Sequence, residues 1–176
     1  MVRIIIILLL VVLQAVMGVP EYFYGESGVA LAPATDFFYG SYWLRALTYS
    51  FFHASWWHLA VNALASWSIY SPKRKTSCIQ IVSSFIIAVL VYPLALRPVL
   101  GFSNVLYAIL GLRTPPLSSP WWKRGEVIVF LIVTVALLAI PRFSAVTHIA
   151  SFLLGMGGAA VGRGWQKLTQ DARRYY

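Results

Sequence analysis

Long apolar stretches separated by short polar and basic segments dominate the hydrophobic pattern of this chain. A helix needs roughly 17–25 mostly apolar residues to cross the hydrocarbon core of a bilayer. Five stretches approach that length, namely Ile4–Val19, Phe52–Tyr70, Cys78–Leu96, Val127–Ile140 and Ala145–Val161, and Pro98–Leu112 is shorter. The pattern predicts an all-α, polytopic membrane protein, a six-transmembrane-helix bundle in one domain over residues 1–176. We place the approximate spans at 4–19, 52–70, 78–96, 101–112, 126–141 and 145–162.

The composition agrees with a membrane protein. Of the 176 residues, 60% are hydrophobic and 11% are charged, and the mean hydropathy is +0.75. A soluble domain of this size is much less apolar. The first apolar stretch has a second interpretation as a cleaved signal peptide, because Arg3 precedes it and Ala15 and Gly18 lie near its end. We favour a retained span, since that cleavage site is poor.

The basic residues are distributed unevenly between the two sides of the predicted bundle. A net charge of +9 would also fit a nucleic-acid-binding protein. With a cytoplasmic amino terminus and six spans, however, only Arg45, Arg97 and Arg142 of the fourteen basic residues lie outside. The other eleven lie in cytoplasmic segments: Arg3, Lys73, Arg74, Lys75, Arg113, Lys123, Arg124, Arg163, Lys167, Arg173 and Arg174. This bias follows the positive-inside rule, so we interpret the charge as membrane orientation and expect no nucleic-acid partner.

The predicted external segment between the first two spans, Pro20–Phe51, is rich in aromatic residues and also carries acidic ones. Amphipathic rings favour the headgroup region of a bilayer. The segment therefore either lies partly in the outer leaflet or forms an ordinary external loop with aromatic anchors.

Polar side chains are rare within the predicted spans. Such groups are costly in a bilayer and usually mark function or a pairing partner. His58 and Asn62 are four residues apart and share one helix face, which also carries Ser55 and Ser66. This polar stripe either binds neighbouring helices or contributes to a functional site.

The fourth span begins unusually deep in the membrane. Its apolar run ends at Arg113, ten residues after Ser103. At about 1.5 Å per residue, Ser103 lies roughly 15 Å from the cytoplasmic edge of a ~30 Å core. The helix therefore begins near mid-depth, where its unpaired N–H groups offer a site for a developing oxyanion. Ser103 is then an N-cap, a nucleophile, or both.

The other polar residues fall in the same layer. The same depth count places Asn62 at roughly 17 Å and both His58 and His148 at roughly 22 Å. None of the five acidic residues lies in this layer. A serine nucleophile here would therefore work with a histidine as a dyad, without a third acidic member.

Two stripes of small residues could bring the serine and the histidine together. The sixth span carries one of them, formed by His148, Ser151, Gly155, Gly158 and Gly162. The fourth span carries the other, formed by Ser103, Tyr107 and Gly111. Small residues allow close helix approach, and docking these faces would bring His148 within hydrogen-bond reach of Ser103. The alternative is a packing seam with incidental polar groups.

Taken together, these motifs resemble those of the rhomboid intramembrane proteases, and the resemblance covers nearly the whole chain. Its motifs are His53-x4-His58-x3-Asn62 with Arg45 and Thr48 before it, Gly101-Phe102-Ser103 followed by Val105 and Tyr107, and His148 with Gly155. Each motif is weak alone. In this order and on these helices they indicate a rhomboid-type serine endopeptidase.

The resemblance implies a role for each residue of the polar layer. Ser103 would attack the scissile carbonyl, and His148 would take its proton and return it to the leaving amine. His58, Asn62 and the Ser103 N–H would stabilise the oxyanion. The substrates implied are membrane proteins that are cut in or beside a transmembrane helix near the outer face.

The resemblance also implies supporting residues, with two departures from the family pattern. The supporting residues are Tyr107, which would orient His148, His53 in the polar cavity, Gly101 in the nucleophile motif, and Arg45, which would brace the first external loop. The family usually has glycine where this chain has Asn104, directly after the serine, and Ser151, three after the histidine. Both positions pack tightly, so the changes bear on how closely the two helices approach. Asn104 is also a candidate oxyanion donor.

Two rival functions stay open. A catalytically inactive rhomboid-like protein that binds transmembrane helices predicts the same fold, although it has no need of this serine and these histidines. A transporter or channel would need polar groups continuing towards the cytoplasm, where the second span offers only Ser66 and Ser68.

For the protease we expect no metal and no other cofactor, with transmembrane protein substrates and the lipid bilayer as partners. We expect it in a prokaryotic cell membrane with both termini cytoplasmic. The residues do not fix the oligomeric state.

Overall fold

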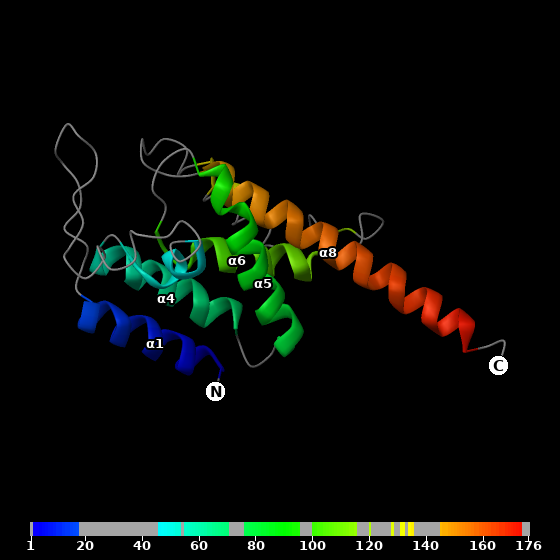
Figure 1. The fold of residues 1–176 in the computed structure, drawn as a ribbon, viewed down its shortest axis with the longest axis horizontal. Coiled ribbons are helices and arrows are strands. Elements are labelled where there is room, and N and C mark those ends of the chain that lie inside the picture. The colour runs from blue at the N-terminus through cyan, green and yellow to red at the C-terminus, as the bar shows by residue number, and fades with distance from the viewer. Residues whose placement is uncertain are drawn as a thin grey trace.

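A computed structural model describes residues 2–17, 46–53, 55–70, 76–95, 100–115, 120, 128, 131–132, 134–135 and 145–173. The regular elements described are α1 (Val2–Met17), η1 (Tyr49–Phe51), α4 (Trp56–Ile69), α5 (Cys78–Val91), η2 (Tyr92–Leu94), α6 (Ser103–Arg113) and α8 (Ala145–Ala172) (Figure 1). Within these ranges every regular element is a helix, which confirms the all-α prediction.

Capping residues set two helix starts that the hydrophobic pattern alone does not locate. The predicted second span began at Phe52, but α4 begins at Trp56 because the Ser55 hydroxyl accepts a hydrogen bond from the His58 N–H at 3.1 Å. Ser77, directly before α5, forms a capping box with Gln80 in the first turn of the helix. Both ends therefore follow from local hydrogen bonding.

The predicted spans at residues 4–19, 101–112 and 145–162 correspond to α1, α6 and α8, with shifted ends. The largest difference is α8, which continues to Ala172. The predicted span at 126–141 lies mostly outside the described residues. The five residues described there (128, 131, 132, 134 and 135) are helical.

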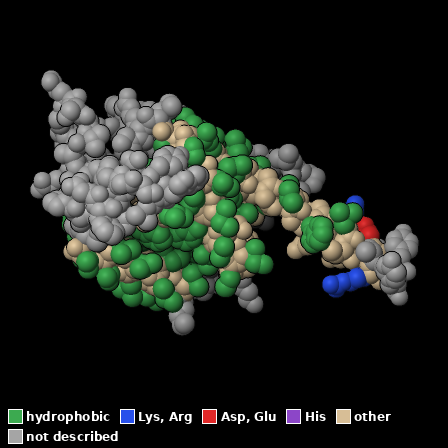
Figure 2. All heavy atoms as spheres, viewed as in Figure 1, with side chains coloured by type: hydrophobic (Ala, Val, Ile, Leu, Met, Phe, Trp, Pro, Cys, Tyr) green, Lys and Arg blue, Asp and Glu red, His purple; other side chains and the backbone are tan. Residues whose placement is uncertain are grey.

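One described helix, over Ala145–Asp171, is long and apolar enough to cross a membrane by length and composition. Two shorter apolar helices cover Val2–Val16 and Cys78–Leu94. The count of six spans therefore stays a prediction. The surface is nevertheless strongly apolar, since Trp57 is 83% exposed and Ile79 78% exposed. Figure 2 shows hydrophobic side chains over much of the described surface, with charged ones gathered at the far end of α8.

Helix α6 forms the centre of the described bundle. Seven of its eleven residues are buried, and it packs against α5, α8 and α4. Leu106 and Ile109 of α6 join a core cluster that includes Leu10 of α1 and Leu59 of α4. Because its neighbours bury most of α6, this helix holds the residues at its two ends in place within the bundle.

The α6–α8 seam forms as the small-residue stripes predicted. A β-carbon on Gly111 would collide with the Phe152 carbonyl oxygen, and one on Gly155 would collide with the Ala108 carbonyl oxygen. Gly158 lies beside the Leu112 side chain, whereas Gly162 faces open space and is not part of the contact. The backbones of α6 and α8 therefore touch directly at Gly111 and Gly155.

Three arginines form contacts between helices at the end of the bundle opposite Ser103, the arginine-fastened end. The Arg3 guanidinium lies 3.7 Å from the centroid of the Trp67 ring. Arg113 donates to the Ile69 carbonyl oxygen at 2.5 Å and to the Thr76 hydroxyl. Arg163 donates to the Thr114 carbonyl oxygen at 3.1 Å. All three arginines belong to the set that the charge pattern assigns to the cytoplasmic side.

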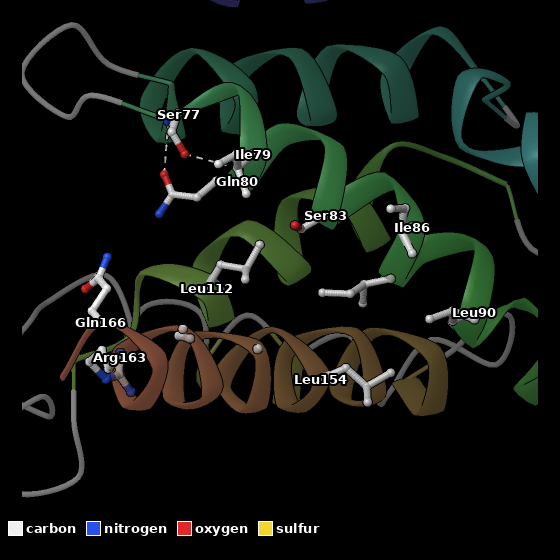
Figure 3. Close-up of a pocket in the computed structure, with 14 residues that line it drawn as sticks. Ser77, Ile79, Gln80, Ser83, Ile86, Leu90, Leu112, Leu154, Arg163 and Gln166 are labelled. Atoms are coloured by element: carbon white, nitrogen blue, oxygen red, sulfur yellow. Dashed lines mark hydrogen bonds between the residues drawn. The ribbon is translucent and has the colours of Figure 1, made fainter. Parts of the chain in front are cut away.

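A groove of about 800 Å³ lies between α5 and α8, with Leu112 of α6 in its lining (Figure 3). Its walls are apolar at Ile86, Leu90 and Leu154, and Arg163 stands at its polar end. The lining includes neither Ser103 nor His148. The groove is therefore separate from the polar layer.

Candidate active site

Ser103 is the first residue of α6, and its hydroxyl is not used as a helix cap. Phe102 occupies the N-cap position, and no side chain caps the helix there. The N-cap interpretation of Ser103 is therefore wrong. The side chain is partly buried, and the first N–H groups of the helix lie at this end.

His148 of α8 meets Ser103 across the seam. The Nε2 atom of His148 lies 2.7 Å from the Ser103 Oγ, so the two side chains form a short hydrogen bond. The histidine is 4% exposed. The hydrogen-bond reach expected from the two small-residue stripes is therefore observed.

Tyr107 packs against the histidine ring. Its ring centroid lies 4.7 Å from that of His148 at an interplanar angle of 68°, an edge-to-face contact. The Tyr107 hydroxyl lies 3.0 Å from the Thr134 Oγ1 in a buried hydrogen bond. The packing of Tyr107 against His148 that the resemblance implied is present. Thr134, which fixes the far end of the tyrosine, was missed by sequence reasoning because it lies 27 residues further along the chain.

Gly101 allows the segment before Ser103 to approach α4 closely. Its φ angle of +114° lies in a region that L side chains rarely adopt. A β-carbon there would stand 2.6 Å from the His58 Cε1 and 3.5 Å from the Asn62 Nδ2. Gly101 therefore lies directly against these two side chains, and any side chain at this position would be strained by the φ angle and would crowd the His58 ring.

His58 and Asn62 lie on one face of α4, as the four-residue spacing predicted. The Asn62 Nδ2 donates a hydrogen bond to the His58 carbonyl oxygen at 3.1 Å. An amide nitrogen carries two N–H donors, so this bond uses one of them. Both side chains border the backbone that leads into Ser103.

His53 is fully buried between α1 and the serine segment. Its Nε2 accepts a hydrogen bond from the Phe102 N–H at 3.4 Å, and its ring centroid lies 5.2 Å from that of His58. Gln14 of α1 donates to the His53 carbonyl oxygen at 3.3 Å and accepts from the His53 N–H at 3.2 Å. Gln14 was missed in the sequence. A single glutamine in an otherwise apolar stretch was the signal that could have found it.

The arrangement offers nucleophilic chemistry. A hydroxyl in contact with an imidazole, next to a helix amino terminus and two further polar side chains, suits attack on a carbonyl group. Among the described residues, no group of three histidine, cysteine or acidic side chains could bind a metal ion. Arg45 lies outside the described residues.

Comparison with known proteins identifies the family. The family model of the Rhomboid domain matches residues 40–164. The chain therefore belongs to the rhomboid family of membrane-embedded proteins, an intramembrane protease family, as its motifs suggested. No curated protein matches the chain.

Proposed function

We propose that this protein is an intramembrane serine endopeptidase that uses Ser103 and His148 as a catalytic dyad to cleave transmembrane segments near the outer face. The observation that carries the proposal is the 2.7 Å hydrogen bond between the Ser103 Oγ and the His148 Nε2. The two residues lie on separate helices, 45 positions apart, and meet at the amino terminus of α6. A packing seam alone has no need of that pair.

In the first step the Ser103 hydroxyl donates its proton to the His148 Nε2 while its oxygen bonds to the scissile carbonyl carbon. The electron pair of the C=O double bond moves to the carbonyl oxygen, which gives a tetrahedral oxyanion and an imidazolium. The edge-to-face contact with the Tyr107 ring keeps the imidazole in place during this transfer. The hydrogen bond already present puts the base within reach of the proton.

The oxyanion is stabilised by donors around Gly101. Candidates are the Ser103 N–H at the start of α6, the second Asn62 amide N–H and the His58 ring. The closeness of Gly101 to His58 and Asn62 supports this assignment. The loss of one such donor in other serine hydrolases costs about 100- to 1,000-fold in kcat.

The intermediate then collapses and is hydrolysed. The C–N bond breaks, its electron pair goes to the leaving nitrogen, and His148 gives that nitrogen the proton, which leaves an ester on Ser103. A water molecule next gives a proton to His148 and attacks the ester carbonyl. The C–O bond to Ser103 in the second tetrahedral intermediate then breaks, which releases the new carboxyl terminus, and His148 returns the proton to the Ser103 oxygen. The cycle needs no cofactor.

The position of the dyad in the fold supports a membrane-embedded substrate. The arginine-fastened end, which carries Arg113, lies one helix length from Ser103, or about 15 Å of rise along α6. With that end cytoplasmic, the dyad lies below the outer surface of a six-span bundle whose termini are both cytoplasmic. A substrate helix must unwind there, because its own hydrogen bonds shield each peptide bond.

The test reconstitutes purified protein into liposomes with a generic transmembrane substrate. The parent is compared with Ser103→Ala and His148→Ala, and Ser84→Ala serves as a matched control, since Ser84 is a fully buried serine on α5. We expect cleavage by the parent and the control and none by the two dyad variants. Cleavage that persists unchanged in both dyad variants would overturn the dyad. Absence of cleavage by every protein would favour an inactive protein that binds transmembrane helices.

A further inference from the structure

One tyrosine contacts the backbone and side chain on both sides of Ser103. The Tyr49 carbonyl oxygen accepts a hydrogen bond from the Gly101 N–H at 3.1 Å. The Tyr49 hydroxyl accepts another from the Asn104 Nδ2 at 3.0 Å. Residue 49 of η1 therefore binds the chain two positions before the serine and one position after it.

Tyr49 is itself held firmly. Its hydroxyl donates to the Ala88 carbonyl oxygen of α5 at 2.8 Å, and its ring lies 5.0 Å from that of Tyr92, centroid to centroid. Tyr49 is 3% exposed. A continuous hydrogen-bonded chain thus runs from α6 through Asn104 and Tyr49 to the backbone of α5.

Asn104 is poorly explained as a residue kept for stability. It is fully buried, and within the described part of the chain its Oδ1 has no hydrogen-bond partner. An unpaired buried amide oxygen is unfavourable, so an apolar or small residue would suit the core better. Its Nδ2 faces η1, which gives the amide a partner other than an oxyanion.

We propose that Tyr49 and Asn104 form a clamp that positions Ser103 for proton transfer to His148. The inference rests on the proposed protease function. Neither clamp residue touches the reacting atoms in this account; they are positioning residues that fix the first turn of α6. A turn fixed at residues 101 and 104 leaves the Ser103 Oγ little freedom to leave the His148 Nε2.

The clamp is tested by Tyr49→Phe, Asn104→Ala and the double variant, each assayed for kcat and KM in liposomes. Tyr49→Phe keeps the ring and removes only the hydroxyl. We expect each single variant to lower kcat by about three- to tenfold with KM unchanged, because each removes the hydrogen bond between Asn104 and Tyr49. Tyr49→Phe also removes the hydrogen bond to the Ala88 carbonyl oxygen. The double variant should be no slower than the slower single variant, because both changes break the same clamp.

If Tyr49 and Asn104 served only stability, their variants would lower the melting temperature without lowering kcat per folded molecule. Ser84→Ala removes the 2.6 Å hydrogen bond to the Ile81 carbonyl oxygen from the same α5 helix, without touching the clamp. This control should lower the melting temperature and leave kcat at the parental value. The rate at which a fluorophosphonate labels Ser103, measured per folded molecule, should fall in the clamp variants and stay unchanged in Ser84→Ala.

The two levels of the hypothesis fail separately. Parental kcat and labelling rate in both clamp variants, with Ser103→Ala inactive, would refute the clamp and leave the protease intact. A parent that neither cleaves nor reacts with fluorophosphonate would refute the protease and the clamp with it. Additive losses in the double variant would mean that Tyr49 and Asn104 act independently, which also contradicts the clamp.

Discussion

Replacing Gly155 by alanine tests how closely α6 and α8 must pack for the dyad to form. A β-carbon at Gly155 would collide with the Ala108 carbonyl oxygen and also meet the Leu112 backbone nitrogen at 2.9 Å. Ordinary contacts between non-bonded heavy atoms need about 3.5 Å, so the helices must separate by roughly 1 Å. Both contacts are backbone atoms, which have no alternative rotamer to relieve the clash.

That displacement is transmitted to the dyad. Gly155 lies two turns from His148 on the same rigid helix, so a shift of roughly 1 Å stretches the 2.7 Å bond to Ser103 beyond hydrogen-bond range. A misplacement of about 1 Å can cost roughly 100-fold in rate. We expect kcat to fall by about that factor and the free energy of unfolding to fall by about 1–3 kcal/mol from overpacking.

The assay compares Gly155→Ala with Gly157→Ala by cleavage in liposomes, fluorophosphonate labelling and thermal melting. Gly157 is on the same helix, but no atom lies within 4 Å of its β-carbon position. Both changes raise helix propensity equally, so the comparison isolates the clash. We expect Gly157→Ala to match the parent in kcat and labelling rate. Equal kcat for the two variants would refute the reasoning that backbone contact at the seam sets the dyad distance.

Two further outcomes follow from the site. Asn62→Ala should lower kcat about 100-fold with little change in KM, because it removes a proposed oxyanion donor; a variant with parental kcat would exclude Asn62 from that role. Gln14→Leu should lower the free energy of unfolding by about 2 kcal/mol, because it leaves the buried His53 N–H and carbonyl oxygen unpaired; unfolding in detergent micelles with an unchanged midpoint would contradict this.

The sequence was informative where a residue type and a period alone decide the structure. Glycines every few residues predicted the α6–α8 seam, because only a missing side chain permits backbone contact. The scarcity of polar residues in apolar stretches selected Ser103, His58 and His148, since a bilayer penalises such groups. These inferences needed only local spacing and helix geometry.

Other features depended on partners far along the chain. Tyr49 looked like one more aromatic ring in an aromatic segment, and its contacts with Asn104 and Ala88 span 55 and 39 positions. Gln14 likewise acts on His53, 39 positions away. The hydrophobic periodicity of the sequence does not reveal contacts between residues so far apart. The start of α4 was also missed, because the Ser55 side-chain cap that sets it is not part of the hydrophobic pattern. The N-cap at Phe102 was missed because no side chain caps α6 there.

The two ends of the bundle are held together by different kinds of contact. At the arginine end, Arg113 and Arg163 tie the carbonyl groups at the ends of α4 and α6 to neighbouring helices. At the serine end, the helices are held together by hydrogen bonds between uncharged groups and by ring contacts. Under the proposed protease function, a separation of helices that admits a substrate is therefore expected on the serine side, where the peptide bond would have to reach Ser103.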